Sequence, residues 1–66
     1  RAMTGAEIDM AGRLLSAIRS KRDVTVTELS SMTGMQYGCL MAVLGRLEAD
    51  GMINIDMLQR CSINTR

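Results

Sequence analysis

Few side chains in this chain could carry out chemistry. It contains no histidine, so neither a Ser-His nor a Cys-His pair can form, and nucleophilic catalysis of that kind is excluded. Its two cysteines, Cys39 and Cys61, lie far apart without another soft ligand and do not make a zinc site. No glycine-rich motif that could cradle a phosphate is present. We interpret the seven acidic residues as helix caps and solvated surface, and we expect a protein that is not an enzyme and uses no metal or cofactor.

Length and composition limit the classes of protein further. Sixty-six residues form one domain at most, and a chain of this size buries only about 60% of its unfolded surface. The net charge of +1 gives no strong attraction to nucleic acid or to a membrane. No apolar run approaches the roughly 20 residues that span a bilayer, and no signal-peptide pattern is present. Two cysteines are too few for a disulfide framework, so we expect buried free thiols in a cytoplasmic protein.

Two helix starts are marked by capping boxes, in which a threonine is followed three residues later by a glutamate. The first is Thr4 with Glu7, and the second is Thr25 with Glu28. The first helix should run to about residue 20, and the second should span seven or eight residues and end at Gly34. The expected core face of the first helix is Ile8, Ala11, Leu14, Leu15 and Ile18. The expected apolar stripe of the second is Val26, Leu29 and Met32.

Three basic residues, Arg19, Lys21 and Arg22, stand where the first predicted helix ends. The favoured interpretation is that they complement the helix dipole and keep the domain soluble. The alternative interpretation is that they contact phosphate groups.

The last part of the chain predicts a third helix followed by a hairpin. The helix should start at Gln36 and end at Asp50-Gly51. Residues 52–56 and 60–64 alternate between apolar and polar side chains, as strands do, and residues 57–59 connect them. Val24 is expected to form a further strand of only one or two residues. The expected core face of the third helix is Leu40, Val43, Leu44 and Leu47.

This order of elements resembles the winged helix-turn-helix superfamily. The best-matching segments are Glu28-Leu29-Ser30 through Thr33-Gly34-Met35, then the Leu47-Glu48 pair that is closed by Gly51. The resemblance implies an α+β fold, with a three-helix helix-turn-helix core and a C-terminal two-stranded β-hairpin as the wing. Residues 4–66 would be a single winged helix domain, and residues 1–3 a cloning remnant or the start of the chain.

The same resemblance implies double-stranded DNA as the partner, with the third helix in the major groove and the wing on the flanking backbone. A module of this kind belongs to a transcription regulator or a DNA-processing protein, as a homodimer or as part of a larger chain. By position, the implied DNA contacts are Gln36, Tyr37, Met41, Ala42 and Arg46 on the helix, and Gln59 and Arg60 on the wing.

An alternative function is protein interaction without DNA binding. It is suggested by small residues at helical spacing on the third helix, opposite the expected core face. They are Gly38, Ala42, Gly45 and Ala49, with Met41 beside them. Each glycine costs a helix interior roughly 1 kcal/mol relative to alanine, which suggests a use for a smooth surface. Three interpretations of this stripe remain: it packs against a partner helix or strand, it lies close to DNA, or it has no ligand at all.

The predicted hairpin connection is apolar, because it contains Met57 and Leu58. The favoured interpretation is that these two side chains fold back onto a core that is short of apolar residues. The alternative is that they are presented to a partner.

Overall fold

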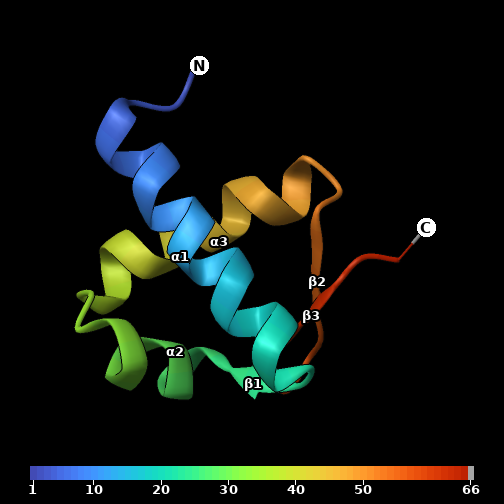
Figure 1. Cartoon of the computed structure of the whole chain (residues 1–66). Coiled ribbons are helices and arrows are strands. Elements are labelled where there is room, and N and C mark those ends of the chain that lie inside the picture. Colours follow the sequence, from blue (N-terminus) through green and yellow to red (C-terminus); the bar gives the residue numbers. More distant parts are fainter. Residues whose placement is uncertain (66) are drawn as a thin grey trace.

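Three helices and one small sheet make up the part of the chain that the computed structural model describes, which is residues 1–65 (Figure 1). The elements are α1 (Gly5–Lys21), β1 (Val24–Thr25), α2 (Val26–Thr33), α3 (Tyr37–Ala49), β2 (Ile53–Ile55) and β3 (Arg60–Ile63). The expected α+β class is confirmed, and each predicted helix and strand lies within about two residues of its expected bounds. No helix within residues 1–65 is both long and apolar enough to cross a membrane.

Both capping boxes form as the sequence predicted. The Thr4 Oγ1 accepts the Glu7 N–H at 3.2 Å, and the Glu7 carboxylate accepts the Thr4 N–H at 2.9 Å. The equivalent distances at Thr25 and Glu28 are 3.1 and 3.0 Å. Each box satisfies two backbone N–H groups that would otherwise have no acceptor at a helix start, so the starts of α1 and α2 are fixed locally.

The α2–α3 turn depends on Gly34, which has a φ of 70° and caps α2 in the left-handed conformation, as expected. Its N–H donates to the Ser30 carbonyl oxygen at 2.9 Å. The Ser30 hydroxyl then donates to the Met35 carbonyl oxygen at 3.1 Å, which holds the turn against the end of α2. A side chain at residue 34 would carry the strain of a positive φ, whereas glycine does not.

The sheet is antiparallel with the order β1-β3-β2, so β3 is its central strand. Ile53 pairs with Ile63 between β2 and β3, and Val24 pairs with Cys61 between β1 and β3. The expected two-stranded hairpin is therefore extended to three strands by the short β1. The reason is that Val24 is fully buried and places the chain beside β3 just before α2 begins.

A single apolar core lies between the helices and the sheet, and the predicted core face of α3 is confirmed. The buried core residues are Ala11, Leu14, Ile18, Val24, Val26, Leu29, Leu40, Val43, Leu44, Leu47, Ile53 and Cys61.

Two residues that were expected in this core are exposed instead. Ile8 is 58% exposed and Met32 is 48% exposed. Ile8 lies one turn before Ala11, the first buried residue of α1, and Met32 lies one turn after Leu29, the last buried residue of α2. Periodicity identified the correct face of each helix, but it does not show how far along that face the neighbouring elements reach.

Candidate functional site

Tyr37 and Gln59, which the sequence proposed separately as contact residues, lie together. The Gln59 Nε2 donates a hydrogen bond of 3.1 Å to the Tyr37 hydroxyl oxygen. Tyr37 opens α3 and is 52% exposed, while Gln59 ends the β2–β3 connection and is also exposed. This contact joins two segments that are far apart in the sequence. With their chain neighbours Gln36 and Arg60 they make up what we call the polar cluster.

The backbone holds Gln59 in place. Its φ of 59° is uncommon for a residue other than glycine. Its N–H donates to the Asp56 carbonyl oxygen at 3.0 Å, and its own carbonyl oxygen accepts the Val26 N–H at 3.0 Å. The main chain of Gln59 therefore contacts the start of α2, while its side chain contacts the start of α3.

Asp56 organises the β2–β3 connection. Its Oδ1 accepts the N–H groups of Leu58 and Arg60, each at 2.9 Å, and its Oδ2 forms an ion pair of 3.1 Å with the Arg60 Nε. An aspartate that accepts from the backbone two residues on is a common way to stabilise a turn. The hydrogen bond from the Arg60 backbone is the main cause of a lowered pKa of the Asp56 carboxyl, and its side-chain hydrogen bond adds to the effect.

Acidification should therefore loosen this connection. A folded-state pKa below the usual 3.8 means that the ionised Asp56 stabilises the fold; this contribution is present above 3.8 and is lost as the pH falls through the lowered value. We expect the Leu58 and Arg60 amide resonances to move together between about pH 5 and about pH 2, with a midpoint below 3.8. Asp56→Asn keeps an acceptor oxygen but cannot ionise, so it should show no such step. A midpoint above 3.8 would contradict the network.

The tight connection directs its apolar residues outward. Met57 is 100% exposed and Leu58 is 71% exposed, so the expectation that they fold back onto the core is wrong. The hydrogen bonds that Asp56 accepts from Leu58 and Arg60 close the connection within a few residues, which leaves no length of chain to reach back.

The predicted contact residues further along α3 are arranged differently. The Arg46 Nε forms an ion pair of 3.2 Å with Asp50, and an Arg46 Nη1–H donates to the Arg1 carbonyl oxygen, so this side chain lies towards the start of the chain. Met41 is half-buried and packs against the core, whereas Ala42 is exposed. Among the proposed DNA contacts, a side-chain hydrogen bond joins Tyr37 and Gln59.

The segment that contains α3 and the β2–β3 hairpin carries little net charge. Residues 36–64 contain two arginines, Arg46 and Arg60, against the three carboxylates Glu48, Asp50 and Asp56, which gives a net charge of −1. Each arginine is paired with a neighbouring aspartate, although exposed pairs of this kind contribute little and are easily exchanged for another anion.

The stripe of small residues on α3 is exposed at all four positions, as predicted: Gly38, Ala42, Gly45 and Ala49. At Gly38 and Gly45, no heavy atom lies within 4 Å of the position that a Cβ would occupy. Neither glycine has a positive φ. Both glycines therefore present bare helix backbone to the surroundings.

The two cysteines differ from each other. Cys61 is fully buried in β3, and burial raises the pKa of its thiol, which keeps it protonated and unreactive. Cys39 is exposed, so the expectation of two buried thiols is wrong for it. It lies in the first turn of α3, just ahead of Leu40, the first buried residue of that helix. Within residues 1–65 no group of three or more Cys, Asp or Glu side chains is placed to hold a metal ion.

No protein-family model matches this chain, and neither a curated protein nor a solved structure matches it significantly. Its function is therefore inferred from its own residues. The polar cluster was missed by sequence reasoning as a cluster, although its members were named. The one signal that could have indicated it is Asp56, whose spacing from Leu58 and Arg60 is typical of an aspartate that closes a turn.

Proposed function

We propose that this chain is a winged helix domain that binds double-stranded DNA through the polar cluster. In this proposal α2, the turn at Gly34 and α3 are the helix-turn-helix, and the β2–β3 hairpin is the wing. The observation that carries the proposal is the 3.1 Å hydrogen bond between Gln59 and Tyr37. It holds the first turn of α3 beside the hairpin connection, so that both segments can contact one duplex.

The start of α3 supports the proposal because it lacks the caps that α1 and α2 possess. Gln36 is the N-cap residue, and its side chain makes no capping hydrogen bond. The first N–H groups of α3 precede the first intrahelical bond, in which the Leu40 N–H donates to the Gln36 carbonyl oxygen at 2.9 Å. Such N–H groups at the positive end of the helix dipole are good donors to a phosphate oxygen.

The side chains of the polar cluster suit DNA. The amides of Gln36 and Gln59 can each donate to and accept from base edges or phosphates, and the Tyr37 hydroxyl can do the same. Arg60 would exchange its exposed pairing with Asp56 for a phosphate. With few cations available, we propose a binding mode in which polar contacts contribute more than counterion release.

Affinity for duplex DNA should consequently depend only weakly on salt. Because residues 36–64 contain only two arginines, the slope of log Kobs against log[salt] should be no steeper than about −2. The measurement is the anisotropy of a labelled duplex, titrated with the domain at several salt concentrations. Arg60→Ala should make the slope shallower by about 1.

A matched control for this experiment is Arg13→Ala. Arg13 is an exposed arginine of α1 that lies outside the polar cluster, so its removal should leave the slope unchanged. Amide shifts on adding DNA should centre on Tyr37, Gly38 and Gln59. If Arg13→Ala and Arg60→Ala reduced the affinity equally, the binding would be a general effect of charge and the assignment to the polar cluster would fail.

The second candidate function is protein interaction through the stripe of small residues on α3, with Met41 beside it. The observation that favours it is the net charge of −1 over residues 36–64, which repels phosphate overall. A partner helix or strand could approach closely at Gly38 and Gly45, where the space beside the backbone is open. The two functions predict different consequences for one substitution, Gly45→Leu.

A further inference from the structure

The central strand β3 is covered on one side along only part of its length. β1 pairs with it through Val24↔Cys61 and Thr25↔Arg60, and within residues 1–65 no strand pairs with Ile63 on that side. The chain cannot extend β1 backwards, because Arg22 has a φ of 67° and its N–H caps α1 by donating to the Ile18 carbonyl oxygen at 2.9 Å. We call the uncovered side of β3 around Ile63 the open edge.

The hydrogen-bond pattern of β3 directs backbone groups to the open edge. Towards β2, the Arg60 carbonyl oxygen accepts the Asp56 N–H at 3.1 Å, and the Asn64 N–H donates to the Met52 carbonyl oxygen at 3.0 Å. In an antiparallel strand, successive residues point their N–H and C=O groups to opposite sides. Even-numbered residues of β3 therefore bond to β2, and the N–H and C=O of Ile63 point away from β2 to the open edge.

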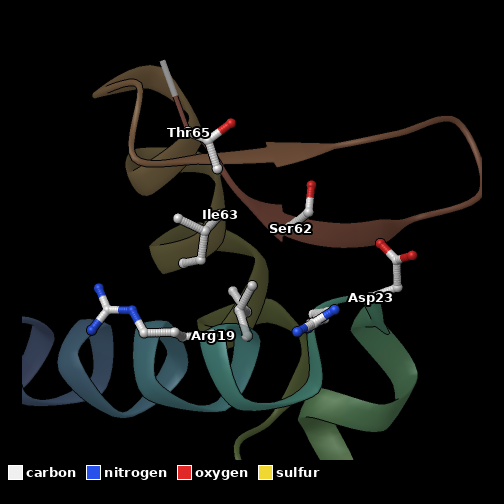
Figure 2. A pocket seen from close by; sticks show the side chains of 7 residues that line it. Arg19, Asp23, Ser62, Ile63 and Thr65 are labelled. Carbon is white, nitrogen blue, oxygen red and sulfur yellow. The ribbon is translucent and has the colours of Figure 1, made fainter.

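A hollow of about 430 Å³ lies beside the open edge, between the last turns of α1 and β3. Ile63 lies on its β3 side and Arg19 on its α1 side (Figure 2). Ile18, which is fully buried, and Ile63 give it an apolar floor, and Arg19 and Arg22 stand at its rim with Asp23. The hollow is large enough for one or two side chains of a bound segment.

The rim of the hollow is basic. Within residues 1–65, neither Arg19 nor Arg22 makes an ion pair or a side-chain hydrogen bond. Among the described residues that line the hollow, Asp23 is the single carboxylate beside two arginines, so these residues give the rim a net positive charge. From the sequence, the favoured role of Arg19, Lys21 and Arg22 is to cap the helix and keep the domain soluble. That role does not account for the apolar floor between the two arginines.

We propose that the open edge docks an extended acidic segment of another protein, which adds to the sheet beside β3. Its backbone would hydrogen-bond to the N–H and C=O of Ile63, one apolar side chain would enter the hollow, and acidic side chains would meet Arg19 and Arg22. A second copy of this chain fits less well, because pairing two open edges would bring the arginines of both copies together. The open edge shares no residue with the polar cluster, so this proposal is independent of DNA binding.

The experiment is a titration of the 15N-labelled domain with a short peptide of alternating valine and glutamate. Amide shifts should centre on Arg19, Ser62 and Ile63. A version with lysine in place of glutamate, and a version N-methylated on every second residue so that it cannot donate to a strand, should both fail to bind. Arg19→Glu should weaken binding of the acidic peptide at least about fivefold. Arg13→Glu, an equal charge change at an exposed site of α1 outside the hollow, should leave it unchanged.

Several results would overturn the proposal. Absence of any shift up to the solubility of the peptide would do so, as would shifts confined to the polar cluster. If the lysine peptide bound equally well, recognition by charge would be refuted. If the N-methylated peptide bound equally well, addition of a strand beside β3 would be refuted. Shifts of Arg19 and Ile63 with duplex DNA but not with the peptide would assign the open edge to nucleic acid. Dimerisation of the free domain through Ile63 would assign it to a second copy. The fold of both arginine variants is checked by their spectra, which should retain the dispersion of the unsubstituted domain.

Discussion

Leu44→Ala should destabilise the domain by about 2–5 kcal/mol, the largest effect that we expect from a single truncation. Leu44 is fully buried on the core face of α3, so its removal leaves a cavity that neighbouring side chains fill only in part. Folded domains of this length are stable by only about 3–10 kcal/mol. The variant should therefore be partly or largely unfolded. The measurement is denaturant unfolding, in which the midpoint should fall while the slope m stays unchanged.

The matched control is the next residue, because Gly45→Ala should act in the opposite direction. Gly45 is exposed, its φ is ordinary, and the space that a Cβ would occupy is empty. Alanine should therefore stabilise α3 by up to about 1 kcal/mol through helix propensity alone. If Gly45→Ala unfolded the domain, or if Leu44→Ala were neutral, the faces of α3 would be assigned wrongly.

Features that depend on neighbouring residues alone could be predicted from the sequence. Thr4 and Thr25 cap their helices because a glutamate stands three residues on, and Gly34 ends α2 because it tolerates a left-handed backbone. The core face of α3 follows from the spacing of its leucines. Each of these rests on contacts within one or two turns, and no knowledge of the remaining fold is needed.

Features that depend on where other elements lie were predicted poorly. Ile8 and Met32 continue an apolar period, yet the core ends one turn before it reaches them. Met57 and Leu58 were expected to fold back for want of core residues, but the length of the connection does not allow it. In each case the type of residue indicated burial, and the geometry of the neighbouring elements decided against it.

The candidate site was predictable as a set of residues and unpredictable as an arrangement. Tyr37 and Gln59 were named through a family resemblance, whereas their hydrogen bond depends on a positive φ at Gln59. The open edge of β3 was missed altogether. It exists because Arg22, two residues before β1, caps α1 and keeps the chain from pairing with β3 any earlier. The sequence carries no glycine or asparagine there to indicate the positive φ of Arg22.

The two surfaces proposed here differ in what they can bind. The polar cluster combines uncharged donors and an uncapped helix start with a slightly negative surrounding, so it suits a ligand that is recognised by hydrogen bonds. Within residues 1–65, the open edge combines backbone groups of Ile63 that no strand pairs on that side with the arginines of the hollow, so it suits an acidic chain. A domain that used both could hold a duplex and a protein segment at the same time, because the two sites have no residue in common.

Gly45→Leu should separate the two proposed functions of α3. Gly45 lies on the same helix face as Gly38, two turns further on, so a leucine there would stand out from an otherwise smooth surface. If a partner backbone packs on this stripe, the substitution should weaken the association at least about tenfold, or roughly 1.4 kcal/mol. If α3 enters the major groove, the affinity for duplex DNA should fall instead. The measurements are a pull-down with the unsubstituted domain as reference and the anisotropy titration with duplex DNA.

Gly12→Leu is the control that makes this experiment decisive. Gly12 is an exposed glycine inside α1 with open space around its Cβ position, so both substitutions should stabilise a helix by a similar amount, about 1 kcal/mol or less. Only Gly45→Leu should change binding, because Gly12 lies outside the stripe and the polar cluster. If neither substitution altered DNA binding or protein association, the exposed face of α3 would have no ligand of either kind. Its glycines would then be a tolerated cost to helix stability, and both protein interaction through the stripe and entry of this face of α3 into the major groove would have to be abandoned.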